Sequence, residues 1–502
     1  MKEISEYLKN LSDEQRIAVT CTDRNVVCVA GAGTGKTHTL ISRICHQVND
    51  LNADPTSILC LTFTRNAAFE FESRYKLMSE NKICPTFGTF HQFCYKLLSM
   101  PEFLYKFGYS YCPLIIDESQ DTYYRDKAKL LSSCKLPNKK LSKNYVPTRS
   151  EKFQYDVFFK CYSQLLKKDN VITFDSLSSH ISSLFDKNDP ICSEVLSQYR
   201  YVYVDEFQDT DPLQWAFVRS FCDSSNIFVV GDPYQSIYSF RGASPDIMRS
   251  LINNPSWTTI RLSTNYRSTQ EICDFVNNFV TDKNDPNAIK LKSDRHGQNI
   301  SSIHESDISK QISKLSSEET AVLFRTNEEV RRLSSYLESS NVSFTNNQSN
   351  QEEIIQSSLD EHYFAQCVLA KLPQYVRRSL IESSYVSSID EVIDDRRVIS
   401  LGEIYCKSFF DDVNDFMSSE EFNDIRNMYM NNEFDIDSLR TSRSMSSLLY
   451  IGTIHSVKGL QFKNVIVASF ESIYKNIDRG DNRNLLYVAC TRAEDRLYVV
   501  TE

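Results

Sequence analysis

Residues 30–37 read Ala-Gly-Ala-Gly-Thr-Gly-Lys-Thr, and this stretch decides the fold. The residues before it, Val26 to Val29, form a short apolar run typical of a buried parallel strand, and Thr37 to Val48 can continue as a helix. A glycine-rich turn between a strand and a helix N-terminus binds polyphosphates. The first position departs from the general pattern, because Ala30 stands where that pattern has glycine. We predict an α/β fold built around a nucleotide site.

Residues 202–209 read Val-Tyr-Val-Asp-Glu-Phe-Gln-Asp and supply the carboxylates that a phosphate loop lacks. An apolar run over 201–204 predicts a strand that ends at Asp205 and Glu206. We assign Lys36 to the β- and γ-phosphate oxygens, Thr37 and Asp205 to Mg²⁺, and Glu206 to an attacking water. A glycine-rich stretch alone can be no more than a turn, but this strand context and carboxylate pair favour a nucleotide hydrolase.

The composition is that of an ordinary folded protein of more than one domain, with 502 residues, 41% hydrophobic and 24% charged. The fifteen cysteines are scattered without a C-x-x-C pair, which favours a reducing interior over a zinc or redox module. We see no apolar run of transmembrane length and no signal peptide. We therefore expect a soluble protein, cytoplasmic or associated with the nucleoid, that does not bind membranes.

The net charge of −10 is unevenly distributed. Residues 125–168 carry twelve Lys and Arg against three Asp and Glu, whereas residues 388–437 carry fourteen acidic against four basic side chains. The basic segment can follow a phosphate backbone or be a solvated helical face, and composition alone does not choose between the two. A phosphate backbone would repel the acidic segment.

Further motifs make sense once ATP is placed. The apolar run 227–230 predicts a strand that ends in a polar loop, where Gln235 is a candidate γ-phosphate sensor and aromatic residues can stack on bases. Arg267 directly follows Tyr266, and Arg492 comes five residues after Tyr487; each can stabilise charge on a transferring phosphoryl group. Gln15 can read an adenine edge, cap a helix with Ser12, or do both.

In this order, these strings resemble the motifs of UvrD/Rep/PcrA-like superfamily 1 DNA helicases, from Leu11 to about Val500. The resemblance implies Mg-ATP as cofactor, single-stranded DNA and strand junctions as partners, and movement in the 3′→5′ direction. It implies these catalytic residues: Lys36, Asp205, Glu206, Gln235, Arg267 and Arg492. It implies these nucleotide contacts: Gln15, Ala30, Gly31, Ala32, Gly33, Thr34, Gly35, Lys36, Thr37, His38, Tyr266, Arg267, Gly459, Gln461 and Arg492. It implies these nucleic-acid contacts: Phe63, Thr64, Arg65, Thr89, His91, Tyr238, Phe240, Arg241, Thr453 and His455.

The resemblance also implies two RecA-like motor domains with parallel sheets, each carrying an inserted, mainly helical subdomain. We predict the first motor domain over 1–97 and 190–262, with a basic insertion over 98–189. We predict the second motor domain over 263–372 and 448–502, with a short acidic insertion over 373–447. ATP would lie between the motor domains, and single-stranded DNA would cross both.

Residues 114–121, Leu-Ile-Ile-Asp-Glu-Ser-Gln-Asp, look like a second metal-binding motif. Only one such motif is expected for each phosphate loop, and the copy at 202–209 precedes the Gln235 loop at the family's spacing. We therefore interpret Asp117 and Glu118 as structural or surface residues at the entry to the first insertion.

Four residues depart from the expected patterns: Ala30 at the first phosphate-loop position, which relatives share, and His38, Gln461 and Phe240, where relatives commonly have Arg, Glu and Trp. The largest departure is the second insertion, which is short and acidic. We hypothesise a translocase that unwinds weakly alone, or one whose acidic segment binds a protein partner, and we expect a monomer or weak oligomer. The alternative is a DNA-stimulated regulatory ATPase that remodels protein–DNA complexes without unwinding. A small-molecule kinase fits the Gln235 loop and the two arginines poorly, and an RNA substrate stays open.

Overall fold

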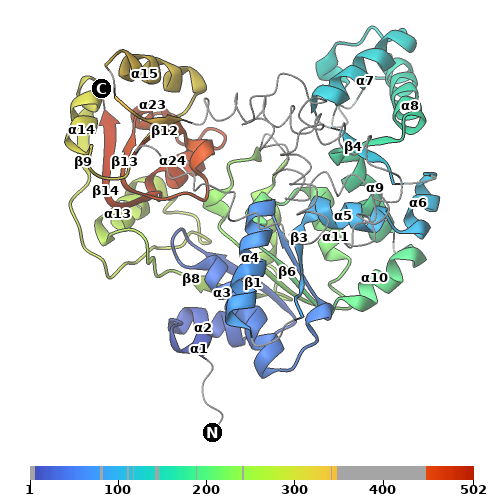
Figure 1. Cartoon of the computed structure of the whole chain (residues 1–502), viewed down its shortest axis with the longest axis horizontal. Coiled ribbons are helices and arrows are strands. Elements are labelled where there is room, and N and C mark those ends of the chain that lie inside the picture. Colours follow the sequence, from blue (N-terminus) through green and yellow to red (C-terminus); the bar gives the residue numbers. More distant parts are fainter. Residues whose placement is uncertain are drawn as a thin grey trace, which may run out of the picture.

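The computed structural model describes residues 6–79, 83–109, 112–116, 118–141, 145, 147–187, 189–239, 242–340, 342–346 and 448–501. Two six-stranded sheets, parallel throughout, dominate these residues (Figure 1). The acidic insertion predicted over 373–447 lies outside the described residues. The predicted α/β class with two parallel-sheet motor domains is confirmed, whereas the domain boundaries stay a prediction.

The first sheet has the strand order β3-β2-β6-β7-β1-β8. Its strands are β1 (Asn25–Ala30), β2 (Ile58–Thr62), β3 (Thr86–Thr89), β6 (Tyr201–Val204), β7 (Asn226–Gly231) and β8 (Thr258–Leu262). Successive side chains of a strand face opposite layers, so Val26 and Cys28 join one apolar cluster while Val27 and Val29 join the other. Burial on both faces explains why this strand is a continuous apolar run rather than an alternating one.

Helices cover both faces of the first sheet (Figure 1). One layer consists of α2 (Asp13–Thr20), α3 (Lys36–Cys45) and α4 (Arg65–Met78), and α1 (Glu6–Lys9) precedes it. The other consists of α5 (Phe90–Leu98), α9 (Phe174–Asp186), α11 (Pro212–Arg219) and α12 (Pro245–Ile252). The helix predicted from Thr37 to Val48 begins at Lys36 and changes at His46 into one π-helical turn.

The second sheet repeats the all-parallel pattern with the order β11-β12-β10-β13-β14-β9. Its strands are β9 (Ser301–His304), β10 (Thr320–Phe324), β11 (Thr345–Asn346), β12 (Leu449–Thr453), β13 (Phe462–Val467) and β14 (Ala493–Thr501). One face packs on α14 (Ile308–Lys314) and α15 (Asn327–Ser339). The other packs on α13 (Gln270–Phe275), α23 (Phe470–Tyr474) and α24 (Asn482–Cys490).

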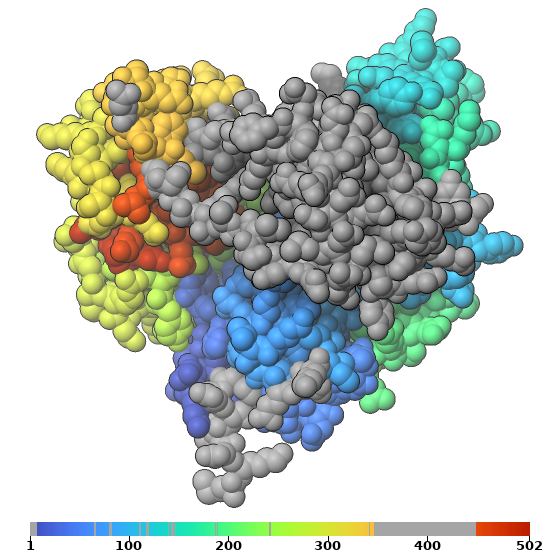
Figure 2. Space-filling model, in the orientation of Figure 1, coloured from blue at the N-terminus to red at the C-terminus, as the bar shows by residue number. Residues whose placement is uncertain are grey.

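The basic segment between residues 98 and 189 forms a lobe at one side of the first sheet (Figures 1 and 2). It contains α6 (Pro101–Phe107), β4 (Leu114–Ile116), α7 (Glu118–Leu131), α8 (Lys152–Lys168) and β5 (Val171–Thr173), and α10 (Ser193–Gln198) follows it. In the described part of the chain β4 pairs only with β5, so the motif at 114–121 does not reach the edge that carries the phosphate loop. Asp117 and the side chain of Glu118 lie outside the described residues.

The end of this segment belongs to the core of the first motor domain. Leu177, Ile181 and Phe185 of α9 are buried, and the Phe185 ring lies 4.7 Å from that of Phe217 on α11. By contrast, α7 and α8 share a separate apolar cluster around Phe158. The outer part of the lobe is therefore stabilised by its own small core.

Candidate active site and nucleic-acid interface

The carboxyl ends of the parallel strands of the first sheet meet at one edge, and the predicted site residues follow them. Thr62 is in register with Thr89, and Leu61 with Val204, so the ends of β3, β2 and β6 lie side by side. Several predicted nucleic-acid residues lie at or after the ends of β3, β2 and β7, and several predicted nucleotide residues lie at or after the ends of β6, β7, β1 and β8. Ligands of open parallel sheets bind at this edge.

The phosphate loop after β1 uses glycine where only glycine fits. Gly33 and Gly35 have φ values of 70° and 79°. A Cβ atom on Gly33 would lie 2.7 Å from Asn265 Oδ1. Asn265 is buried, and its Nδ2 donates to the Ala32 carbonyl at 2.9 Å, while its Oδ1 accepts the backbone N–H of Arg267 at 2.7 Å. The loop is therefore locked against the segment after β8.

Asp205 and Glu206 directly follow β6. Lys36 Nζ lies 3.8 Å from Glu206 Oε1. Burial and the charge of Glu206 raise the pKa of Asp205, whereas Lys36 and Lys458 outweigh the effect of burial on Glu206 and lower its pKa. The Glu206 backbone has a φ of 48°, a strained conformation for any residue but glycine. Glu206 is therefore ionised at neutral pH and available as a base.

Gln235 lies on a short 3-10 turn, Pro233–Gln235, that follows β7. Its Nε2 donates to Asp232 Oδ2 at 2.8 Å. The Asp232 backbone N–H donates to Gln208 Oε1 at 2.9 Å, and Gln208 Nε2 donates to the Glu206 carboxylate. The candidate sensor and the candidate base are thus joined through one glutamine of the second motif.

The two predicted arginines follow elements that pack on different sheets. Arg267 follows β8, and its Nε donates to Gln461 Oε1 at 2.9 Å. Arg492 follows α24 and is buried, and its Nη1 donates to the Leu460 carbonyl at 3.1 Å. Burial and the neighbouring Arg267 lower the pKa of Arg492 to about 9, and burial lowers the pKa of Arg267. A polyanion beside these two cations would stabilise both.

Both polar atoms of the Gln15 side-chain amide form hydrogen bonds. Its Nε2 donates to the Thr34 carbonyl at 3.0 Å, and its Oε1 accepts the Ser12 backbone N–H at 3.1 Å. The predicted capping box with Ser12 is confirmed, and the predicted adenine contact of Gln15 stays a prediction. Tyr266 donates its backbone N–H to the Gly33 carbonyl at 2.8 Å and leaves its side chain 50% exposed, open to a stacking partner.

Two further predicted nucleotide contacts flank this group. His38 lies in the first turn of α3, where burial lowers its pKa, so its imidazole is neutral at physiological pH. Gly459 precedes β13 with a φ of 89°, two residues before Gln461. His38 is two residues after Lys36 of the phosphate loop. Gly459 is close in sequence to Gln461, which accepts the Arg267 Nε–H.

Phe63 and Tyr238 form the centre of the predicted nucleic-acid surface. Their rings are stacked, with centroids 5.6 Å apart and planes 11° apart. The His455 ring lies 6.5 Å from that of Tyr238. Phe63 follows β2 and Tyr238 follows β7, whereas His455 follows β12 of the second sheet. Aromatic faces of this kind stack on nucleic-acid bases without choosing among them.

Four other predicted nucleic-acid residues have structural contacts of their own. Thr64 and Thr89 are N-caps, and their Oγ1 atoms accept backbone N–H groups of α4 and α5 at 3.2 Å. His91 packs its ring edge-on against Phe174 at 5.2 Å, and burial lowers its pKa. Thr453 ends β12 and accepts the Ser456 hydroxyl at its carbonyl, at 2.7 Å. Capping roles leave the predicted DNA contacts of the two threonines untested.

Phe240, Arg241 and the side chain of Arg65 lie outside the described residues. Conversely, sequence reasoning did not assign roles to several residues that the structure brings into the site: Asn265, Gln208, Asp209, Lys458, Asn484 and Tyr487. Each of these residues lies within or beside one of the sequence motifs, so its position relative to that motif was the available signal. Their partners, which define their roles, are more than twenty residues away in most cases.

The residues present fit Mg-ATP. Within the described chain, Lys36 Nζ and Asp205 Oδ1 are buried without a hydrogen-bond partner, as expected of groups meant for a phosphate and a metal ion. The N-cap of α3 is Gly35, which makes no side-chain capping bond, so the first N–H groups of the helix point to the loop uncapped. Thr37 is the next hydroxyl along this helix and would join Asp205 in holding the metal.

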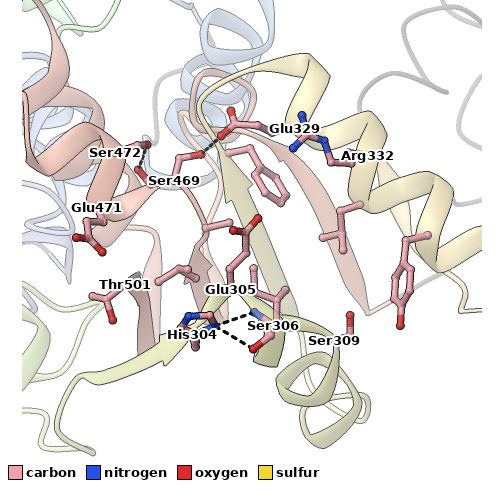
Figure 3. Close-up of a pocket in the computed structure, with 16 residues that line it drawn as sticks. His304, Glu305, Ser306, Ser309, Glu329, Arg332, Ser469, Glu471, Ser472 and Thr501 are labelled. Carbon is pink, nitrogen blue, oxygen red and sulfur yellow. Dashed lines mark hydrogen bonds between the residues drawn. The ribbon is translucent and has the colours of Figure 1, made fainter.

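A separate pocket of about 580 Å³ lies in the second motor domain (Figure 3). Phe324 and Val500 are among its apolar lining residues, and Glu305, Glu329 and Glu471 are among its charged ones. None of the predicted site residues lines it, and no glycine-rich turn enters it. Chemistry rather than size therefore favours the first sheet as the nucleotide site.

Comparison with known proteins agrees with this geometry. The UvrD/REP helicase N-terminal domain matches residues 11–120 and 116–256, and models of the UvrD-like helicase C-terminal domain match residues 260–351 and 448–500. A probable DNA helicase II homolog of Mycoplasma capricolum is 33% identical over 307 residues, which are 55% of this chain and 42% of the relative. ATP-dependent DNA helicase PcrA of Staphylococcus epidermidis is 25% identical over 619 residues, covering 99% of this chain and 84% of the relative.

DNA helicase II of Escherichia coli is 29% identical over 310 residues, which are 58% of this chain and 43% of the relative. The matched part thus spans less than half of this relative and of the Mycoplasma one. In the part of the chain that the structure describes, no helix has the length and apolarity to cross a bilayer. The family models cover both six-stranded sheets, and the chain therefore belongs to the UvrD-like helicase family.

Proposed function

We propose that this chain is an ATP-dependent DNA helicase or translocase that moves 3′→5′ on single-stranded DNA. The observation that carries the proposal is the shared edge of the first sheet, where nucleotide residues and stacked aromatic rings follow neighbouring strands. Gln235 and Tyr238 are only three residues apart on one loop. A change at the γ-phosphate would therefore reach a base-stacking ring over a very short length of chain.

The residues divide the hydrolysis among them. Lys36 and the uncapped N–H groups of α3 bind the phosphates, and Arg267 and Arg492 stabilise the charge that develops during transfer. Ionised Glu206 accepts the proton of the attacking water, with its carboxylate oriented by Gln208. Mg²⁺, held by Thr37 and Asp205, would neutralise phosphate charge. Tyr266 and Gln15 are proposed to hold the adenine.

DNA is proposed to cross both motor domains over Phe63, Tyr238 and His455. Names of relatives support DNA as the substrate, because PcrA and DNA helicase II are DNA helicases by name. The nucleoid is then the expected place of action. The insertion boundaries at 98–189 and 373–447 form part of the same proposal, as does the monomeric or weakly oligomeric state.

A regulatory ATPase that remodels protein–DNA complexes is the second candidate. The excess of acidic residues over 388–437 favours it, because such a segment repels DNA and suits a protein partner with a basic surface. Strand displacement separates the two: the first candidate opens a duplex with a 3′ tail, and the second hydrolyses ATP on the same DNA without opening it.

The decisive measurement is ATP hydrolysis with and without single-stranded DNA, with Glu206→Gln as the control. Strong stimulation by DNA that the variant abolishes is expected of a nucleic-acid motor. Hydrolysis that DNA does not change would contradict the proposal. Replacing the DNA by single-stranded RNA of the same sequence tests the sugar, and duplexes with 3′ or 5′ tails test the direction.

A further inference from the structure

The loop that carries Gln235 is held from the second motor domain. Asn484, on α24, donates from Nδ2 to the Ser236 carbonyl at 2.7 Å and to the Pro233 carbonyl at 3.1 Å. Lys458, after β12, donates from Nζ to the Gln235 carbonyl at 2.9 Å. Three of the four carbonyls of residues 233–236 thus accept hydrogen bonds from two side chains of the other domain.

Lys458 also contacts the base-stacking ring. Its Nζ lies 4.8 Å from the centroid of the Tyr238 ring, within the range of a cation–π interaction. The same ammonium group pairs with Asp209, which is buried at the end of the second motif. Lys458 is only 12% exposed, so its bonds are shielded from solvent. One side chain therefore contacts the sensor loop, the carboxylate motif and the aromatic surface.

The rest of α24 strengthens this connection. The Tyr487 hydroxyl accepts the Ala32 backbone N–H of the phosphate loop at 3.3 Å, and the Tyr487 ring lies 5.5 Å from that of Tyr234. Asp481, just before the helix, pairs with the Ser239 hydroxyl. Contacts thus extend from the phosphate loop to the residue after Tyr238, and α24 also packs against α23, β13 and β14 of the second domain.

We propose that Lys458 and Asn484 form an interdomain clamp that couples the nucleotide state to DNA affinity, a role that rests on the function proposed above. Both are positioning residues, since their contacts are with the loop rather than with nucleotide or DNA. When the second domain moves, the clamp carries the backbone of residues 233–236 with it. Gln235 and Tyr238 then shift together, so the sensor and the stacking ring change in the same step.

The test measures the dissociation constant of single-stranded DNA with and without a non-hydrolysable ATP analogue. The wild type is expected to show a ratio of about 5–150 between the two states, the range of ordinary coupling between sites. Asn484→Ala and Lys458→Ala are expected to bring the ratio close to one, with the KM for ATP changed less than the ratio. Lys458→Arg, which keeps the charge and the donors, is expected to restore part of it.

Matched controls are Asn476→Ala and Lys475→Ala, which remove the same groups from the neighbouring turn without touching the loop. Thermal melting checks folding, and Asn484→Ala keeps the test decisive if Lys458→Ala leaves buried Asp209 unpaired and unfolds. A wild-type ratio retained in folded Asn484→Ala, and in Lys458→Ala where it folds, with DNA-stimulated hydrolysis intact, overturns the clamp alone. If DNA does not stimulate ATP hydrolysis by the wild type, both the proposed function and the clamp are overturned.

Discussion

The two six-stranded sheets share a parallel pattern, yet the turns after β1 of the first sheet and β10 of the second differ. After β1 the chain uses three glycines in five residues, and the N-cap of α3, Gly35, makes no side-chain bond. After β10 the turn is Arg-Thr-Asn, and Thr326 caps α15 in a capping box with Glu329. The first helix therefore presents free N–H groups to a ligand, whereas the second satisfies its own.

This difference shows that the strand pattern does not determine which sheet edge carries the nucleotide-binding residues. Both edges are open to ligands, and the second has a pocket of about 580 Å³ beside α15. Only the first has the uncapped helix end, the buried Lys36 and the carboxylate pair. The second domain contributes to the site at the first sheet instead, through Arg492 and the residues of α24.

The largest expected effect is at Arg492, a buried side chain of the second domain. Arg492→Lys keeps the charge but loses the planar fork, and we expect kcat to fall by about 10³-fold or more, the usual size of an arginine contribution to phosphoryl transfer. Steady-state hydrolysis with saturating DNA measures it. An unchanged kcat would show that the second domain supplies no charge to the reaction.

Glu206→Gln is expected to lower kcat by about 10²–10⁴-fold, because the amide cannot accept the proton of water. ATP binding, measured by titration with a fluorescent nucleotide, should persist. The matched control is Glu329→Gln at the equivalent edge of the second sheet, which keeps the capping box, since Gln also serves at that position. Equal losses in both variants would remove the distinction between the two edges.

Tyr238→Ala is expected to weaken binding of single-stranded DNA by about 5–150-fold, which corresponds to about 1–3 kcal/mol for one stacked base. ATP affinity without DNA should stay unchanged. Tyr336→Ala, an exposed tyrosine of the second-domain pocket, is the control. A larger loss from Tyr336→Ala would place the DNA at the second pocket and contradict the assigned surface.

Among these substitutions Gly33→Ala is expected to have the smallest effect. Its effect on nucleotide binding is still specific to that position. Both Gly33 and Gly480 have positive φ, and a Cβ costs about 1–2 kcal/mol in that conformation. Only Gly33 has neighbours in the way, Asn265 at 2.7 Å, whereas Gly480 has nothing within 4 Å. Both alanine variants should therefore melt at lower temperature, but only Gly33→Ala should weaken nucleotide binding.

The sequence predicts the strands well where burial is complete. The runs at 26–29, 201–204 and 227–230 all lie in interior strands of the first sheet, because strands covered on both faces need apolar residues at every position. Residues 114–116 of the second apparent metal-binding motif also form a strand, β4. Among the described residues β4 pairs only with β5, and this pairing, which no local sequence pattern encodes, separates the motif from the metal site.

The amino-acid sequence by itself determined the phosphate loop, the carboxylate pair and the family, because backbone geometry and charge at these points depend on residue type within a few positions. Only the tertiary structure decided that Asn265 locks the loop, that Gln208 joins Glu206 to the sensor strand, and that Asn484 and Lys458 hold the sensor loop. These bonds join residues up to about 250 positions apart, and such partners become neighbours only when two sheets and their helices have packed together.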